Sequence, residues 1–374
     1  GLLRAPGFAA VAILTLALGI GANSAIFSFV DGVLLKPLPY PDPERVLLLW
    51  EKPPGGDINV VSAMNYMDWR NQSSSFTAVA AVTGNQMTLT GRGEPTLLRV
   101  ARVSAGYFDI LGMKPKLGRT FAPDEDVPGK EHVVVLSHRL WATDFGGDPA
   151  LVGQTITLNG EAYTVIGVMP EGSVFDRMFN RLWRPLAFTA GERTRNFHWL
   201  QVFARLKPGV SIEQARAEMD GIGARIAQDY PDSNKGWGVS IVRYMDSIVG
   251  PQMRSSLYVL MSAVGMLLLI GCANLANLTL ARGTSREREV AVRASIGAGR
   301  GRLIRQFLTE NIVLAAAGGL VGIAVGYGFM RLLTILLPPF ALPAVAKVSM
   351  DTRVLGFSFA LSVVTGLIFG LAPA

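Results

Sequence analysis

Four stretches of the chain carry no charged or histidine side chain, and each is long enough to form a membrane-spanning helix. They are Phe8 to Val30, Leu257 to Ala281, Ile312 to Met330 and Val354 to Ala374, with 23, 25, 19 and 21 residues. About 20 apolar residues, at a rise of about 1.5 Å each, cross a hydrocarbon core of about 30 Å. The pattern therefore predicts four transmembrane helices, which we place within 1–35, 257–281, 312–336 and 354–374.

The polar segment between the first two stretches shows the patterns of a folded domain of strands and helices. The strand candidates are Val46 to Trp50, Leu97 to Val103, Val133 to Leu136, Thr155 to Leu158, Tyr163 to Val168 and Leu200 to Leu206. Asn159-Gly160 between two of them suits the positive φ angles of a type I′ turn, which predicts a hairpin. No internal repeat is visible.

One helix in this domain is well defined by its pattern. Ser211, followed three residues later by Gln214, is a capping box. The apolar residues Ile212, Ala215, Met219, Ile222 and Ile226 then recur on a single face, which predicts packing against a sheet. Strands and helices alternate without dinucleotide-fold spacing, so we expect an inserted α+β domain. About 225 residues exceed one typical core, which favours two subdomains.

The charge distribution gives an expected orientation. Only 17% of the residues are charged, the mean hydropathy is +0.34 and the net charge is +7. Residues 282–307 hold +5 of that charge, whereas residues 31–281 sum to zero. An excess of arginine in a short loop between spans is typical of the cytoplasmic side. We therefore expect both chain ends in the cytoplasm and the large domain outside the cell membrane, and we expect no nucleic-acid partner.

Two alternatives concern the ends of the chain. Arg4 before an apolar run also fits a cleaved signal peptide, although the run is longer than a usual signal core. The chain begins with Gly1 and stops at Ala374, at the expected membrane edge. These two ends favour the interpretation that the sequence is a piece of a longer protein.

The segment between the second and third spans predicts a short amphipathic helix over residues 285–296. Thr284 followed by Glu287 is a capping signature, and Gly297, Gly299 and Gly301 interrupt the helix afterwards. Its candidate functional residues are Arg286, Glu287, Arg288, Glu289, Val292, Arg293 and Ile296. They fit either a basic loop that touches anionic lipid or a docking helix for a cytoplasmic motor.

Glycines recur at intervals of four in the last two spans. Gly318, Gly322 and Gly326 form one ridge, and Gly366 and Gly370 form a second. Small residues let helix backbones approach closely, so we expect helix packing within the subunit or between two copies.

The sequence offers no catalytic or metal-binding motif. Cys272 lies inside a span, and the histidines His132, His138 and His198 lack the spacing of zinc ligands. No nucleophile motif is present, so a membrane-anchored hydrolase is disfavoured, and we expect no catalytic residue and no cofactor on this chain.

Several motifs together resemble FtsX-like permeases, the membrane subunits of MacB-type ABC transporters. Residues 286–310, from Arg286-Glu-Arg-Glu-Val-Ala-Val-Arg to Leu-Thr-Glu310, look like the permease signature. Val103-Ser-Ala-Gly-Tyr-Phe-Asp-Ile-Leu-Gly112 and Leu151-Val-Gly-Gln-Thr-Ile-Thr-Leu-Asn-Gly160 are similar to the MacB periplasmic core. Residues 6–27 and Pro37-Leu-Pro-Tyr-Pro41 resemble the acidobacterial-type duplicated permeases of that group.

The resemblance implies a protein that transmits mechanical movement across the inner membrane. In such systems a cytoplasmic ATPase pushes the coupling helix, here 285–296, and the first two spans carry the movement outward. The implied division is a porter-like part over 36–100 and 197–253, an inserted subdomain over 101–196, and an FtsX-like permease domain over 254–374. The implied partners are an ABC ATPase, a second permease copy and the lipid bilayer, with a periplasmic adaptor as a further candidate.

The chain departs from fused transporters of this kind because it contains no Gly-x-x-x-x-Gly-Lys-[Ser/Thr] segment. ATP is therefore expected on a partner. The leading hypothesis is a permease subunit that exports or extracts a substrate. The alternative is an FtsX-like signal transmitter that regulates an extracytoplasmic enzyme without transport.

Overall fold

The chain folds into two compact units joined at two points. A computed structural model describes residues 6–36, 40–91, 93–171, 181–285, 300–338, 346 and 348–371. One unit combines Gly1–Lys36 with Val249–Ala374, and we call it the helical unit. The other unit is Pro37–Ile248, and we call it the sheet unit. The chain passes from one unit to the other at 36–37 and again at 248–249.

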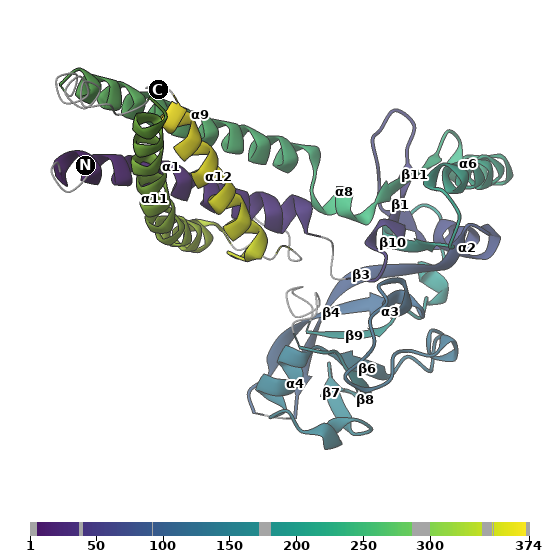
Figure 1. The fold of residues 1–374 in the computed structure, drawn as a ribbon. Coiled ribbons are helices and arrows are strands. Elements are labelled where there is room, and N and C mark those ends of the chain that lie inside the picture. The colour runs from purple at the N-terminus through teal and green to yellow at the C-terminus, as the bar shows by residue number, and fades with distance from the viewer. Residues whose placement is uncertain are drawn as a thin grey trace. The chain divides into compact units, whose positions relative to one another are not determined.

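The helical unit holds four long helices. They are α1 (Pro6–Val30), extended by the π-helical turn η2 (Asp31–Leu35), α9 (Pro251–Ser285), α11 (Arg300–Leu336) and α12 (Thr352–Leu371). Helix α1 contacts each of the other three, and α11 also packs against α12 (Figure 1). The apolar composition predicted helices at these four places, and the structure confirms them.

Three of these helices are long and apolar enough to cross a membrane. The spans are Pro6–Leu35, Pro251–Leu278 and Ile312–Leu336. At the fourth expected position the described apolar stretch is Thr352–Leu367, and helix α12 continues to Leu371. Among the described residues, length and composition therefore support three spans and a shorter apolar helix.

The described residues of the sheet unit form eleven strands in one mixed sheet. The strands are β1 (Val46–Lys52), β2 (Val61–Ser62), β3 (Phe76–Thr90), β4 (Thr96–Val103), β5 (Leu117–Gly118), β6 (Val133–Leu136), β7 (Thr155–Leu158), β8 (Glu161–Val168), β9 (Leu182–Pro185), β10 (His198–Leu206) and β11 (Gly238–Arg243). They are ordered β11-β1-β10-β3-β4-β9-β6-β8-β5, with β2 beside β10 and β7 beside β3 and β8. The pairs β4–β9 and β6–β8 are parallel, and the other described pairs are antiparallel.

In the described part of the sheet unit, six helices accompany the sheet. They are α2 (Ala63–Gln72), α3 (Tyr107–Ile110), α4 (His138–Asp144), α6 (Ile212–Asp229), α7 (Pro231–Asn234) and α8 (Tyr244–Ile248). Short 3-10 turns lie at Pro43–Arg45, Pro123–Glu125, Pro149–Leu151 and Ala190–Glu192. Helix α6 contacts β11 and α2, and α2 contacts β3 and β10 (Figure 1).

Local sequence signals predicted several of these elements accurately. The strands Val133–Leu136 and Thr155–Leu158 have the expected bounds. Asn159 and Gly160 adopt φ angles of 51° and 82°, as the hairpin turn between β7 and β8 requires. Ser211 caps α6 by accepting a hydrogen bond from the Gln214 amide, and all five residues of the predicted apolar stripe are buried.

Strand β3 is the main element that the sequence pattern did not predict. Its centre, Gly84-Asn85-Gln86, contains weak strand formers and interrupts the apolar pattern. The strand is stabilised because its first half pairs with β10 and its second half pairs with β4.

Two hydrophobic cores are described in the sheet unit, and β3 contributes to both. Phe76, Val79 and Ala81 lie in a core with α2, α6, β1 and β10. Met87 and Leu89 lie in a second core with α4 and β6 to β9. One strand thus links two separately packed regions of a continuous sheet.

Candidate functional site: the contacts along helix α1

Helices α1 and α11 approach so closely that the glycines at their contact have no room for a side chain. A Cβ atom on Gly326 would lie 2.9 Å from the carbonyl oxygen of Gly21, and one on Gly21 would lie 2.9 Å from that of Gly322. A Cβ on Gly318 would lie 2.7 Å from the Cβ of Leu16. The first glycine ridge of α11 therefore faces α1 of the same chain. Close backbone contact is the main source of helix association in lipid.

The second glycine ridge lies at a different contact. Gly366 lines a space between α11 and α12, and Gly370 lies within α12. Across this contact, a side chain on Gly319 would overlap the hydroxyl of Ser362. Gly366 therefore faces a contact other than that of the first ridge.

Polar side chains on α1 tie it to the neighbouring helices. The Asn23 amide donates to the Gly19 carbonyl of its own helix and to the Val264 carbonyl of α9, at 2.9 and 2.8 Å. The hydroxyls of Ser24 and Ser358 in α12 are hydrogen-bonded at 2.6 Å. Side-chain hydrogen bonds between helices in a membrane contribute about 0.6 kcal/mol each on average. Helix α1 is thus joined by polar contacts to α9 and α12 and by backbone packing to α11.

A buried carboxylate lies at the C-terminal end of helix α1. Asp31 is fully buried, and its Oδ2 lies 3.4 Å from the Nζ of Lys36. The same Nζ lies 2.8 Å from Oδ2 of Asp351 and 3.0 Å from the hydroxyl of Ser349. Arg353 adds a longer contact of 3.8 Å to Asp31 Oδ1. The ammonium of Lys36 therefore bridges the end of α1 to the segment that begins α12.

The local sequence explains how this bridge forms. The backbone N–H of Lys36 donates to the Asp31 carbonyl at 2.8 Å, which closes the π-helical turn and brings the lysine back over the aspartate. Asp351 Oδ1 accepts from the backbone N–H groups of Arg353 and Val354, so it caps α12. The hydrogen bond from Lys36 lowers the pKa of the Asp351 carboxyl. Opposite charges thus hold the helix end and the cap together.

Sequence reasoning did not single out Asp31 as a site residue. It stands one position beyond the first apolar stretch, where a flanking charge is ordinary. The signal that could have found it is the pair Asp31 and Lys36, five residues apart at the end of a span. Its long-range partners at 349–353 could not be inferred from that spacing.

The predicted coupling residues lie outside the described part of the chain. Helix α9 ends at Ser285 and α11 begins at Arg300. Arg286, Glu287, Arg288, Glu289, Val292, Arg293 and Ile296 all fall between these two bounds. Their role remains a prediction.

The sheet unit has a buried polar cluster of its own around Glu51. Its Oε1 accepts hydrogen bonds from the backbone and hydroxyl of Ser62 and from the Asn65 amide, at 2.8 to 3.1 Å. Its Oε2 lies 2.5 Å from Nδ1 of His198, whose ring stacks on Trp237. The cluster joins β1, β2, α2 and β10. These contacts cross-link four elements of the sheet unit, and the sequence pattern did not indicate them.

The three histidines lie in three separate environments. His198 contacts Glu51, His132 lies 3.4 Å from Glu161, and His138 packs edge-on against Trp141. Across the described ranges, no group of three or more His, Cys, Asp or Glu side chains is placed to hold a metal ion.

Comparison with known proteins gives this geometry its context. Residues 9–222 match the family model of the MacB-like periplasmic core domain, and residues 261–374 match that of the FtsX-like permease C-terminal domain. The chain is 28% identical over 327 residues to the macrolide export ATP-binding/permease protein MacB of Chromobacterium violaceum. This match covers 85% of the chain but 46% of that protein, so the chain spans about half the length of this relative.

Two further proteins are similar to the chain. The uncharacterized ABC transporter permease YknZ of Bacillus subtilis is 27% identical over 300 residues, covering 79% of the chain and 71% of YknZ. The solved periplasmic region of MacB from Actinobacillus actinomycetemcomitans aligns with a TM-score of 0.42 at 17% identity, covering 60% of the chain and 95% of that structure. The family models together cover both units, and the chain therefore belongs to the MacB-like ABC transporter permeases, with a MacB-like periplasmic core domain and an FtsX-like permease domain.

Proposed function

We propose that this chain is a permease subunit that transmits ATP-driven movement to its periplasmic domain, and so exports or extracts a substrate. The observation that carries the proposal is the construction of α1. Its glycines contact the α11 backbone, and its C-terminal end is bridged through Lys36 to Asp351. One of the two connections to the sheet unit follows this helix directly, at 36–37. A helix joined so tightly to its neighbours moves with them, which suits a transmitting element.

The proposed topology has four spans, with both chain ends in the cytoplasm and the sheet unit in the periplasm. The seven arginines of residues 282–307 support it, because an excess of arginine between two spans is typical of the cytoplasmic side. Helix α12 is the fourth span in this proposal. The uncharged stretch Val354 to Ala374, of 21 residues, supports this because about 20 apolar residues cross a hydrocarbon core.

The proposed division of the periplasmic domain corresponds in the main to its two cores, although the second half of β3 and the start of β4 fall in the porter-like range and pack in the second core. We assign a porter-like part to 36–100 and 197–253, and an inserted subdomain to 101–196. The core that contains α2, α6, β1 and β10 supports the first part, and the core that contains α4, β6, β7 and β8 supports the second. Strand β3 crosses between them, so a shift in one part would reach the other through the sheet.

The proposed partners are a cytoplasmic ABC ATPase, a second permease copy and a periplasmic adaptor. The 374 residues contain no P-loop, so ATP is bound and hydrolysed on the ATPase. The residues proposed to dock it are those of the coupling helix at 285–296. The second candidate function, a signal transmitter that acts on a periplasmic enzyme, draws on the FtsX-like match over 261–374.

Charge reversal in the coupling helix tests the proposal. The triple variant Arg286→Glu, Arg288→Glu and Arg293→Glu should lose the ATPase on purification from native membranes, because like charges replace its docking contacts. A matched control reverses three exposed basic residues of the sheet unit, Arg193, Lys207 and Lys235. The control should retain the ATPase, and both variants should insert into the membrane.

Two results would contradict parts of the proposal. An ATPase that copurifies equally with both variants would rule out docking at 285–296. An ATPase whose hydrolysis changes the activity of a periplasmic enzyme, with no substrate leaving the membrane or cell, would favour the signal transmitter.

A further inference from the structure

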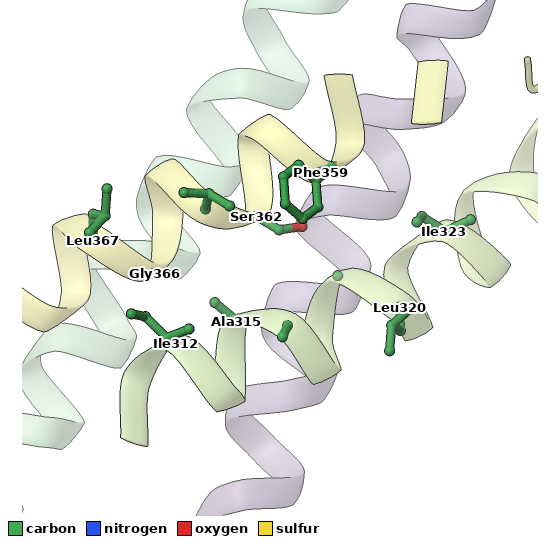
Figure 2. A pocket seen from close by; sticks show the side chains of 11 residues that line it. Ile312, Ala315, Leu320, Ile323, Phe359, Ser362, Gly366 and Leu367 are labelled. Carbon is green, nitrogen blue, oxygen red and sulfur yellow. The ribbon is translucent and has the colours of Figure 1, made fainter. Parts of the chain in front are cut away.

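Two cavities on helix α11 adjoin each other and differ in chemistry. The first, of about 380 Å³, lies between α11 and α12 and is lined almost entirely by apolar side chains (Figure 2). The second, of about 740 Å³, lies between the C-terminal half of α11 and residues 348–355. Leu320 and Ile323 line both cavities, which are therefore adjacent along α11, and we call the two together the groove.

The polar end of the groove is built around Arg331. Its Nε donates to the hydroxyl of Tyr327 at 3.0 Å, and its guanidinium lies 5.4 Å from the centre of that ring. Thr334 and Ser349 also line this cavity. Among the described residues, no carboxylate forms an ion pair with Arg331 within 4 Å. The positive charge at this end of the groove is therefore not neutralised by the described part of the protein.

The direction of the Arg331 side chain is informative. An arginine near the end of a span usually extends toward the nearer helix end, where its charge meets water. Here the guanidinium instead contacts Tyr327, one turn nearer the middle of the helix. The contact keeps the charge beside the groove.

The apolar end of the groove is open toward the expected lipid. Leu320 and Phe359 are 73% and 70% exposed, and Ala316 is also exposed. The floor is formed by small residues, because Gly319 meets Ser362 directly and Gly366 adds no side chain. The one polar group that lines it, the Ser362 hydroxyl, already donates to the Ser358 carbonyl. This part of the groove therefore suits a hydrocarbon chain.

The spacing between the two ends matches a lipid of one leaflet. Arg331 and Gly319 are separated by twelve residues, which is roughly 18 Å along a helix. Half of a hydrocarbon core measures about 15 Å. A headgroup at Arg331 would place the end of its acyl chain in the apolar cavity.

We propose that this groove binds one anionic phospholipid, with the phosphate on Arg331 and an acyl chain between α11 and α12. Charge complementarity favours a lipid over a helix of a second copy, because a single unpaired cation adjoins an otherwise apolar channel. The contact with Tyr327, four residues earlier on the same helix, holds the guanidinium beside this channel. This site goes beyond the transmission of movement and does not depend on it.

Native mass spectrometry of the full chain in detergent tests the site. The protein is titrated with phosphatidylglycerol and with phosphatidylcholine of the same acyl chains, and separately with glycerol 3-phosphate. We expect phosphatidylglycerol to bind about fivefold more tightly than phosphatidylcholine, as one arginine near a lipid surface predicts. Arg331→Gln should remove this preference, Arg331→Lys should keep most of it, and Arg254→Gln on α9 should leave it unchanged.

A second pair of variants tests the acyl-chain end. Ala316→Leu fills the groove and should weaken binding of both lipids, whereas Ala263→Leu, at an exposed alanine of α9, should not. Equal binding of the two lipids to the unaltered chain would overturn the proposal, as would a preference that survives Arg331→Gln. If glycerol 3-phosphate competes as strongly as the lipid does, the site binds a phosphate group without an acyl chain, and the proposal is wrong. If Ala316→Leu changes only the fraction of dimer, the groove is a protein interface and the proposal is wrong.

Discussion

At the residue scale, the helical unit depends on a few buried polar groups. Asp31 is fully buried at the end of an apolar helix, and its charge is compensated mainly by Lys36. A buried carboxylate without its partner is costly, because the desolvation of the charge is no longer offset. The bridge from Lys36 to Asp351 therefore stabilises two segments that are far apart in sequence.

We predict that Lys36→Met destabilises the protein by about 2 to 3 kcal/mol, since it leaves Asp31 buried and nearly unpaired. The double variant Lys36→Met with Asp31→Asn should recover part of this loss, because the buried charge is removed too. The measurement is the free energy of unfolding of the full chain by denaturant in detergent micelles. A double variant that is less stable than Lys36→Met alone would show that the pairing is not the cause.

A second residue-scale prediction concerns acid stability of the sheet unit. Arg102 forms two hydrogen bonds with Glu192, at 2.6 and 3.1 Å, and these lower the pKa of the Glu192 carboxyl from 4.5 to about 2. The stabilisation is thus present above about pH 4.5 and is lost as the pH falls toward 2.

Glu192→Gln should accordingly lower the free energy of unfolding by about 1 kcal/mol at neutral pH, because the pair is partly exposed. The difference in free energy of unfolding between this variant and the unaltered chain should shrink as the pH falls from 4.5 to 2. Unfolding curves recorded across this range give the answer, with Glu94→Gln at an exposed position as the control. A difference that stays constant with pH would contradict the assignment.

At the element scale, the packing of α1 on α11 is set by glycines rather than by large side chains. Gly322 and Gly326 contact the α1 backbone at Ala17 and Gly21. Gly328, only two residues further along α11, has open space around it. The same helix therefore offers a sensitive position and a matched control.

Gly326→Ala should force the two helices apart and destabilise the helical unit by about 1 to 3 kcal/mol, as overpacking does. Gly328→Ala should be neutral or slightly stabilising, because alanine is the better helix former. Thermal unfolding of both variants in detergent distinguishes them. Equal stability of the two variants would mean that α1 and α11 do not pack as described.

At the scale of the whole molecule, the sheet unit carries its hydrophobic cores internally. Helix α6 covers one of them with the buried stripe from Ile212 to Ile226. All six tryptophans, at positions 50, 69, 141, 183, 199 and 237, belong to this unit. Tryptophan fluorescence therefore reports on the sheet unit alone.

We predict that residues 40–248 fold as a soluble domain with cooperative unfolding, since both cores lie within this range. The shorter segment 40–206 should fail to fold, because it lacks α6 and β11 and exposes the core beneath them. Tryptophan fluorescence and near-ultraviolet circular dichroism measure both. A native-like signal from 40–206 would show that α6 is not essential to the core.

Much of this protein follows from patterns within short stretches of sequence. Long apolar runs predict membrane helices because each apolar side chain that leaves water for the hydrocarbon core adds to the free energy that favours insertion. The Asn159-Gly160 hairpin and the capped, striped helix α6 follow from local backbone and packing preferences, and both are confirmed. Family membership also follows, because motifs in both units resemble one group of permeases, as the family models confirm.

Contacts between distant residues were decided only by the tertiary structure. Strand β3 escaped prediction because its polar centre is stabilised by partners on both sides and not by its own composition. Glycine spacing indicated close packing, but it could not show that one ridge faces α1 and the other lies between α11 and α12. Asp31 looks like an ordinary flanking charge until Lys36 and Asp351, 320 residues further on, meet beside it. Local preference sets the elements, whereas the pairing of charges and close-packed surfaces depends on which elements the fold brings together.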